Sequence, residues 1–339
     1  MAERAVVVGA GGISRAWFPP LKEEGVEIPA VVDLDRATAR QKIADWELDA
    51  EATDDLAGAL RRHRPDFVVD LTVPEAHCEV TCTALRAGCH VIGEKPMASS
   101  MDEARRMVRA AEESGKCYMV SQSRRWDVHH DRVRRAVREA GQVGRVTAIN
   151  CDFYIGAHFG GFRAEMPSPL ILDMAIHHFD LARYMTGADP VAVYCQEFNP
   201  AGSWYNGDAA ASAIFEMTDG AVFTYRGSWC SEGFATSWNG NWRIQGEKGA
   251  LLYENDRDPQ VQQPEPAEGS LIWPGREVDV PESPLTHPTM HGGLREMLQF
   301  LRTGQQPQTE CHDNIKSLAM VFAAMQSSRE GRRVEVRPL

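Results

Sequence analysis

The chain has 339 residues, a length that favours two domains over one. Hydrophobic residues make up 43% of it and charged residues 25%, as in an ordinary globular protein. The formal net charge of −12 disfavours nucleic acid as a partner, because phosphate binding needs a basic face. No apolar stretch approaches the about 18 residues of a membrane-spanning helix, and no secretory signal is visible. We therefore expect no membrane partner and a cytoplasmic location.

The cysteine pattern gives no sign of a metal centre. There are eight cysteines, but no Cys-x-x-Cys pair and no Cys/His cluster with zinc spacing. Most of them lie in apolar segments, as buried thiols do. The sequence thus predicts a reducing compartment and no metal site.

The first part of the chain alternates between apolar runs and helical patterns. Buried parallel strands are continuous apolar runs, and strands that alternate with helices indicate a parallel sheet. Within the first helix, Pro19 and Pro20 are expected to bend or break it. Ser100 and Glu103 form a capping-box pattern that opens the last helix of this part. The strands are predicted at 4–9, 27–33, 66–71, 89–93 and 117–121, and the helices at 12–24, 36–45, 55–63, 75–87 and 101–114.

The pattern changes after about residue 125. Long strand-like runs follow one another with few helices between them, which indicates an antiparallel sheet. Residues 255–287 hold many prolines and acids and are expected to form a long surface loop. The strands are predicted at 145–155, 191–198, 209–217, 221–229, 240–245, 249–253 and 333–336, and the helices at 128–140, 170–186, 290–303 and 312–329.

A glycine-rich turn follows the first strand and precedes the first helix. Gly9, Gly11 and Gly12 let the backbone approach a pyrophosphate, and the helix that begins after Ile13 directs its free N–H groups toward the phosphates. Asp33 ends the second strand, where an acidic side chain binds the adenosine ribose hydroxyls. An acid there repels a 2′-phosphate, so the sequence favours NAD over NADP. Arg36 leaves NADP open as the alternative, because its charge could meet that phosphate.

Four motifs follow one another along the chain: Gly9-Ala10-Gly11-Gly12-Ile13-Ser14, Thr72-Val73-Pro74-Glu75-Ala76-His77, Glu94-Lys95-Pro96 and Asp173-Met174-Ala175-Ile176-His177. In this order they resemble the Gfo/Idh/MocA oxidoreductases, a family named for glucose-fructose oxidoreductase and inositol dehydrogenase. The resemblance implies an α/β fold, with an N-terminal Rossmann domain over 1–124. It also implies an α+β domain over 125–339, whose large, mostly antiparallel open sheet builds a homodimer or homotetramer, and whose C-terminal helix can pack back on the first domain. A cis bond before Pro96 is usual in the family, whereas Glu75 replaces a frequent asparagine.

The catalytic residues implied by the resemblance are Lys95, Asp173 and His177. Lys95 follows a strand of the parallel sheet, where ligands bind in open α/β folds, and its ammonium can stabilise a developing alkoxide. His177 can accept a proton near neutral pH, and Asp173, four residues earlier on the same helix, can orient it or bind a hydroxyl. The roles of Lys95 and His177 could be shared or exchanged.

Further residues are assigned by their place in the motifs and loops. The residues expected near the cofactor are Thr72, Pro74, His77, Glu94 and Lys95. A packing role for His77 and a role for Glu94 in holding Lys95 are open alternatives. The substrate candidates are Arg125, Trp126, His158, Trp204 and Tyr205.

The sequence therefore predicts an NAD(P)-dependent oxidoreductase that transfers a hydride between the nicotinamide and a hydroxyl-bearing carbon of a sugar, cyclitol or polyol. Two alternatives stay open: an NAD-dependent glycoside hydrolase of the same fold, and a non-catalytic regulator that senses the nucleotide.

Overall fold

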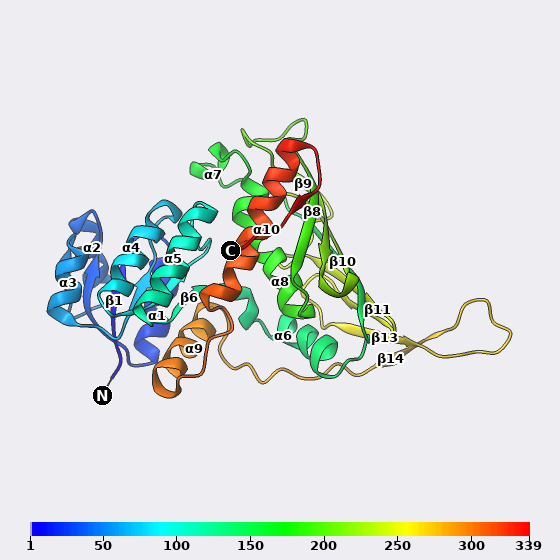
Figure 1. Cartoon of the computed structure of the whole chain (residues 1–339), viewed down its shortest axis with the longest axis horizontal. Coiled ribbons are helices and arrows are strands. Elements are labelled where there is room, and N and C mark those ends of the chain that lie inside the picture. The colour runs from blue at the N-terminus through cyan, green and yellow to red at the C-terminus, as the bar shows by residue number, and fades with distance from the viewer. Residues whose placement is uncertain (1) are drawn as a thin grey trace. The chain divides into compact units, whose positions relative to one another are not determined.

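The computed structural model describes residues 2–339, which form two compact units (Figure 1). Unit 1 holds the chain up to Trp126, Thr286–Leu318 and Pro338–Leu339, and unit 2 holds Asp127–Leu285 and Ala319–Arg337. The chain thus returns to unit 1 after residue 285, whereas the sequence analysis assigns the helix over 290–303 to the second domain. The reason is local packing, because Trp126 lies directly against the backbone of Gly292 and Gly293 in that helix.

Unit 1 is built on six parallel strands in the order β3-β2-β1-β4-β5-β6. The order changes direction between β1 and β4, and at such a switch point the loops after the strands leave room for a ligand. This confirms the predicted parallel sheet. The strands are β1 (Arg4–Val8), β2 (Glu27–Val32), β3 (Glu51–Thr53), β4 (Phe67–Asp70), β5 (His90–Glu94) and β6 (Tyr118–Ser121).

Strand β3 is absent from the sequence prediction. Its three residues, Glu-Ala-Thr, lack an apolar run, and it is an edge strand whose position is set by its pairing with β2. The helices of unit 1 match their predicted ranges closely. They are α1 (Ser14–Glu23), α2 (Arg36–Asp45), α3 (Leu56–His63), α4 (Pro74–Arg86), α5 (Met101–Ser114), α9 (Thr289–Thr303) and the first part of α10 (Cys311–Glu330).

Helix α1 is not broken at its two prolines, contrary to expectation. It runs from Ser14 to Glu23 with Pro19 and Pro20 inside it. The cost of an internal proline, about 3 kcal/mol, is offset by burial, since Trp17, Phe18 and Leu21 are all fully buried. The Trp17 indole also donates a hydrogen bond to Glu94 Oε1 at 2.7 Å. Tertiary contacts thus hold a helix that the local sequence disfavours.

Helix α5 begins as its capping-box pattern predicts. The Ser100 hydroxyl accepts a hydrogen bond from the Glu103 N–H at 3.2 Å, which satisfies a backbone donor of the first turn. The Glu103 carboxylate accepts from the Ser99 hydroxyl instead of from the backbone of Ser100.

Unit 2 contains a nine-stranded sheet in the order β14-β13-β12-β11-β7-β10-β9-β8-β15. All neighbours are antiparallel except β7 and β10, so the expected, mostly antiparallel sheet is confirmed. The strands are β7 (Val146–Tyr154), β8 (Pro190–Phe198), β9 (Ala210–Met217), β10 (Val222–Ser228), β11 (Asn241–Gly246), β12 (Ala250–Tyr253), β13 (Gln260–Pro264), β14 (Gly275–Val278) and β15 (Val334–Glu335).

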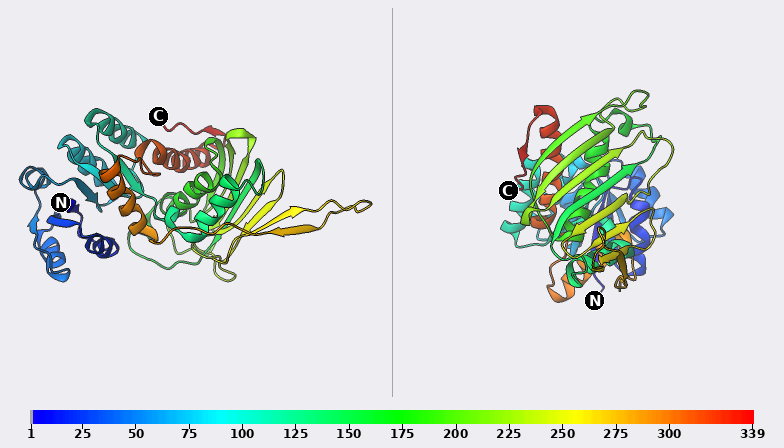
Figure 2. Two further views of the ribbon diagram at one scale, coloured as in Figure 1. Left: turned by 90° about the horizontal axis from the view of Figure 1, so that it is seen from below. Right: turned by 90° about the vertical axis from the view of Figure 1, so that its right-hand side faces the viewer.

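Strands β13 and β14 correct the expectation of a loop over 255–287. They form an antiparallel hairpin at the end of the sheet, which projects from the rest of unit 2 (Figure 2, left). The prolines and charges that suggest a loop are compatible with a hairpin at a sheet edge, because most side chains there face water, Val261 excepted, and Pro264 ends its strand.

Helices cover one face of the large sheet and leave the other open (Figure 2, right). Phe179 of α8 (Ile176–Thr186) packs against Phe215 and Tyr225 on the covered face, with ring centroids 4.8 and 5.3 Å away. The helices predicted at 128–140 and 170–186 each contain a π-helical segment. Unit 2 therefore has α6 (Val128–Arg134) followed by η2 (Arg135–Glu139), the short α7 (Phe162–Glu165), η3 (Leu170–Ala175) followed by α8, and the rest of α10.

Two further observations concern the whole described chain. Among residues 2–339, none of the helices has the length and apolar character needed to cross a membrane. All eight cysteines are free, and seven of them are buried, as the apolar context of most of them predicts.

Glu197 on β8 is a buried carboxyl group in the core of unit 2. It is 6% exposed, and within the described part of the chain its Oε1 has no hydrogen-bond partner. Burial raises the pKa of Glu197 to about 7, with Asp208 adding to the rise and the Ser168 hydroxyl and Arg329 opposing it. A folded-state pKa above the unfolded value means that folding favours the protonated acid. Its contribution to stability is therefore present in acid and is lost as the pH rises toward 7.

We expect Glu197→Gln, which mimics the protonated acid, to raise the free energy of unfolding at pH 8 by about 2–3 kcal/mol. At pH 5 the variant and the native chain should differ little. Urea unfolding at a series of pH values measures this, with the exposed Glu254→Gln as the matched control. Parallel pH profiles for native chain and Glu197→Gln would contradict the assignment.

Candidate active site

The glycine turn after β1 is shaped by a close backbone contact. Gly9 has φ of +93°, and a Cβ atom there would lie 2.6 Å from the Leu71 carbonyl oxygen, so no other residue fits without displacement. Gly11 and Gly12 are exposed, and a Cβ on either would meet no atom of the described residues within 4 Å. The turn therefore combines a tight base with open space above it, as the approach of a pyrophosphate requires.

The N-terminus of α1 lies directly after this open turn. Ile13 precedes the helix and provides no side-chain cap. Ser14, which takes the place of the third glycine of the motif, is buried and donates from its hydroxyl to the Gly11 carbonyl oxygen at 2.6 Å. The serine thus stabilises the turn through an internal hydrogen bond. The N-terminus of the helix adds a positive potential that favours a phosphate.

Asp33 lies beside the same turn. One carboxylate oxygen accepts a hydrogen bond from the Ala10 N–H at 2.8 Å, and the other accepts from the Asp35 N–H at 2.9 Å. The side chain is half-buried, so the charge is fixed in position and still accessible. This is where the ribose-binding acid of a dinucleotide site is expected.

Arg36, the residue that leaves NADP open, is engaged by another acid. Its Nε lies 3.0 Å from Asp54 Oδ1, and both side chains are about half exposed. This ion pair reduces the positive charge available to a 2′-phosphate. Together with Asp33 it favours NAD.

The loop after β4 is organised by a buried acid that the sequence analysis does not single out. Asp70 Oδ1 accepts from the Thr72 hydroxyl at 2.6 Å and from its N–H at 3.2 Å, and Asp70 Oδ2 accepts from the Thr81 hydroxyl. Burial raises the pKa of Asp70. Pro74 is the first residue of α4, where a missing N–H costs nothing. Thr72 and Pro74 thereby keep a fixed place at the carboxyl edge of the sheet.

His77 is a positioning residue in the structure. It is 2% exposed, its Nδ1 lies 2.9 Å from the Pro96 carbonyl oxygen, and its Nε2 lies 3.0 Å from the Thr72 carbonyl oxygen. Both ring nitrogens are thus occupied by backbone groups, which favours the packing alternative over a contact with the cofactor. The ring ties the loop after β4 to the loop after β5.

Lys95 follows β5 at the same edge of the sheet, and the bond between Lys95 and Pro96 is cis, as the family resemblance implies. The Lys95 N–H donates to Glu94 Oε2 at 3.3 Å. Glu94 is itself buried, its other oxygen accepts from Trp17, and burial raises its pKa. Glu94 therefore holds the backbone of Lys95, which is one of the two roles expected for it.

Arg125 and Trp126 are buried in unit 1. Arg125 is 4% exposed and donates to Asp313 Oδ2 and to the Gln308 carbonyl oxygen, each at 2.7 Å. Trp126 is 2% exposed and donates from its indole to Glu296 at 3.0 Å. Both side chains thus pack unit 1, and their expected contact with substrate stays a prediction.

In unit 2, Asp173 lies in η3 and His177 in the first turn of α8. π-Helical segments occur frequently at functional sites. Asp173 Oδ2 accepts from Arg163 Nε at 2.6 Å, and the Arg163 guanidinium stacks over Phe159 and Phe162, 5.0 and 4.6 Å from their ring centroids. Arg163 is absent from the sequence prediction, since α7, which carries it, has no marked pattern.

The two adjacent histidines of α8 have different surroundings. His177 is half-buried, whereas His178 is fully buried beside Phe153, Tyr225 and Trp242 in the core of unit 2. A helix turns by about 100° per residue, so neighbours face different ways. Only His177 keeps a surface on which a substrate can bind.

The aromatic candidates of unit 2 also separate. His158 stacks on Trp204 with ring centroids 3.7 Å apart, and its Nε2 lies 3.0 Å from Glu232. Tyr205 is 3% exposed, stacks on Trp229, and donates its hydroxyl to the Ala157 carbonyl oxygen. The hydroxyl of Tyr205 is thus used within unit 2, and its contact with substrate stays a prediction.

Two family models match the chain in succession. Residues 3–122 match a model described as "Oxidoreductase family, NAD-binding Rossmann fold", and residues 130–252 match the "GFO/IDH/MocA C-terminal domain". The chain belongs to the Gfo/Idh/MocA family. This membership confirms the expected fold, the oxidoreductase class and the NAD-binding Rossmann architecture.

Among its relatives, D-apiose dehydrogenase from Paraburkholderia graminis is 28% identical over 99% of this chain and 90% of its own length. Inositol 2-dehydrogenase from Rhizobium meliloti is 24% identical over 99% of this chain and 100% of its own length. An Agrobacterium radiobacter oxidoreductase, solved with NAD+, L-tartaric acid and magnesium, superposes with a TM-score of 0.86 at 21% identity and covers 99% of each chain.

We expect Asp33→Ser to weaken NAD binding about 10- to 100-fold, because a charge-assisted hydrogen bond to the ribose is lost. NADP binding should fall less or improve, since the repulsion of its phosphate is removed. Fluorescence titration with NADH and NADPH measures both affinities. Asp45→Asn, which removes an exposed charge from α2, is the control; equal losses for both cofactors in Asp33→Ser would contradict the assignment.

Proposed function

We propose that this chain is an NAD-dependent dehydrogenase or reductase of hydroxyl-bearing carbons in a sugar, cyclitol or related polyol. The observation that carries the proposal is the edge of unit 1, where the open glycine turn, the fixed carboxylate of Asp33 and Lys95 follow strands of the same parallel sheet. The names of the full-length relatives, D-apiose dehydrogenase and inositol 2-dehydrogenase, support the class of substrate.

The residues that would hold the cofactor fit it chemically. Gly11 and Gly12 leave room for phosphates, the N-terminus of α1 offers N–H groups, and Asp33 offers a carboxylate to the ribose. When bound, the nicotinamide supplies the hydride acceptor for oxidation and the hydride donor for reduction.

In the proposed oxidation, His177 accepts the proton of the substrate hydroxyl, and the ammonium of Lys95 stabilises the negative charge that develops on that oxygen. In the reduction, His177 returns the proton to the carbonyl oxygen. Lys95 and His177 could share or exchange these roles. In either case, each oxidation removes one hydride and one proton from the substrate.

Asp173, which is bound to Arg163, also acts on His177 or on the substrate in this proposal. Its carboxylate orients His177 or binds a neighbouring substrate hydroxyl, and the 2.6 Å contact with Arg163 fixes where that carboxylate lies. The stack of His158 on Trp204 offers a flat surface in the same unit, which suits the apolar face of a sugar ring. His158 and Trp204 therefore stay our candidates for substrate binding.

The free cysteines support a cytoplasmic location for this activity, because thiols persist in a reducing compartment.

The proposal is tested by recording NADH and NADPH absorbance with a panel of sugars, cyclitols and keto-sugars. We expect NADH to accumulate with at least one polyol, or to be consumed with a keto-sugar. Sustained accumulation separates a dehydrogenase from an NAD-dependent glycoside hydrolase, which returns the hydride in each turnover. No turnover across the panel would favour a nucleotide-sensing regulator.

With a substrate found, Lys95→Ala and His177→Ala should each lower kcat about 100- to 1,000-fold while NADH binding is kept. Lys248→Ala and His129→Ala, which remove a lysine and a histidine of unit 2 that have no role in the proposed reaction, are the controls. Full turnover in either active-site variant would contradict the assigned chemistry.

We also propose that the open face of the large sheet joins copies of the chain into a homodimer or homotetramer. Tyr194 on β8 and Ile214 on β9 lie opposite one another in the sheet and are 47% and 51% exposed. Val191 and Phe198 on β8 and Val222 on β10 are exposed as well. Apolar side chains that recur on an open sheet face are typical of a subunit interface.

The double substitution Tyr194→Lys and Ile214→Lys should reduce the oligomer to monomers, because four charges would meet across a two-fold interface. Sedimentation velocity measures the mass. Leu34→Lys, at an exposed apolar residue of unit 1, is the control. An unchanged mass in the double variant would contradict this interface.

A further inference from the structure

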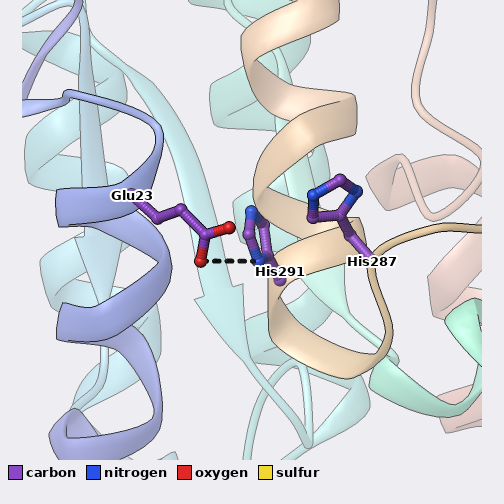
Figure 3. A group of neighbouring side chains, drawn as sticks. All are labelled: Glu23, His287 and His291. Atoms are coloured by element: carbon purple, nitrogen blue, oxygen red, sulfur yellow. Dashed lines mark ion pairs between the residues drawn. The ribbon is translucent and has the colours of Figure 1, made fainter.

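Unit 1 contains a cluster of ligating side chains that the proposed reaction does not use (Figure 3). His287 lies in the segment that enters α9, His291 lies in the first turn of α9, and Glu23 is the last residue of α1. One ligand atom from each of the three lies within 4.8 Å of the other two. The sites for cofactor and substrate described above include none of them.

His291 is held by carboxylates at both ring nitrogens. Its Nε2 lies 2.8 Å from Glu24 Oε1, and its Nδ1 lies 3.8 Å from Glu23 Oε2. The short contact favours the proton on Nε2, because a carboxylate only accepts. The lone pair is then on Nδ1, on the side of Glu23. Histidines that bind metals are typically oriented in this way, by a carboxylate on the nitrogen that does not bind the metal.

His287 is the second imidazole of the cluster. Its ring centroid lies 4.3 Å from that of His291, and the two residues are one helical turn apart in sequence. Arg295 Nη1 lies 2.6 Å from His287 Nδ1. The same Nη1 also lies 3.2 Å from Nε2 of the ring, and the Thr286 hydroxyl lies 2.7 Å from Nδ1. Because a guanidinium only donates, at least one ring nitrogen carries a lone pair that a cation can bind. The Arg295 side chain is 49% exposed and can move away when another cation competes for that lone pair.

We propose that Glu23, His287 and His291 bind a zinc ion, with Glu24 orienting His291. Two imidazoles, one carboxylate and a water molecule are a common zinc ligand set. In a tetrahedral site with bonds of 2.0–2.1 Å, neighbouring ligand atoms lie about 3.3 Å apart. The 3.8 Å between Glu23 and His291 therefore needs only a small contraction. Glu23 and Glu24 carry two negative charges against one positive charge on Arg295, which favours a divalent cation.

A second cluster of potential metal ligands in unit 1 does not favour zinc and provides a comparison. Glu310, Cys311 and His312 also lie close together. However, both nitrogens of His312 lie within hydrogen-bond distance of carboxylates, Glu310 at 2.7 Å and Glu112 at 2.9 Å, and this pairing raises its pKa. His291 has only one carboxylate that close, because Glu23 lies 3.8 Å away. Burial raises the pKa of the Cys311 thiol as well. Both groups thus favour their protonated forms, which do not bind zinc.

The zinc ion connects the C-terminal end of α1 to the N-terminal end of α9. It thereby attaches the segment Thr286–Leu318 to the part of unit 1 that holds the glycine turn. A ligand that binds only the folded chain stabilises it by mass action. The ligands are separate from the residues proposed for catalysis, so the effect we expect of the ion is on the stability of unit 1.

The experiment uses the full chain without a histidine tag, freed of metal by a chelator and titrated with Zn²⁺ by calorimetry. We expect one Zn²⁺ per chain and a rise of the unfolding temperature by a few degrees at saturation. Co²⁺ in place of Zn²⁺ should give the visible absorption of a tetrahedral site. His287→Ala and His291→Ala should abolish binding at one Zn²⁺ per chain, and Glu24→Gln should weaken it about 10- to 100-fold.

Three further variants make the result decisive. Glu23→Gln changes a side chain that is 66% exposed and should fold normally, so a loss of Zn²⁺ affinity there reports the ligand itself. Arg295→Gln should raise the affinity by removing the competing cation. His312→Ala should leave it unchanged. Failure to bind one Zn²⁺ per chain, equal affinity in Glu23→Gln and the native chain, or loss of binding in His312→Ala would overturn the proposal.

Discussion

The structure of unit 1 depends on the contact between the backbone at Gly9 and the backbone at Leu71. A side chain at residue 9 would lie 2.6 Å from a carbonyl oxygen, so the ends of β1 and β4 can approach only because glycine is there. This approach places the C-terminal ends of β1 and β4 side by side, at the edge of the sheet where the loops after β1, β4 and β5 begin. Asp33 then reaches the Ala10 N–H, and the turn keeps its open side for a ligand.

Buried polar groups fix the loops around this edge. Asp70 arranges Thr72, His77 joins the loop after β4 to Pro96, and Glu94 holds both Trp17 and the backbone of Lys95. Burying a carboxyl group costs free energy unless it is hydrogen-bonded, and each of these acids accepts at least two bonds or is paired with an indole. These hydrogen bonds hold each loop at several atoms. A loop held in this way positions a reactive side chain better than apolar packing alone.

In unit 2 the same segment serves packing and chemistry through different faces. His178 and Phe179 fill the core against the sheet, while His177 and Asp173 keep partial exposure. The π-helical turns of η3 precede α8, and Arg163 holds Asp173 from the neighbouring short helix. A rigid inner face and a polar outer face on one helix give the proposed proton acceptor a fixed support.

The sequence by itself determined the order of elements, the glycine turn, Asp33 and the strand that ends at Lys95, because these follow from local periodicity and from motifs of adjacent residues. It also placed His177 and His178 on different helix faces. Only the tertiary structure decided that Arg125, Trp126 and Tyr205 are buried, that α1 continues through two prolines, and that Arg163 meets Asp173. Glu23 likewise meets His291 only in the fold. These outcomes depend on contacts between residues far apart in the chain, and no local pattern records which side chains such contacts remove from water.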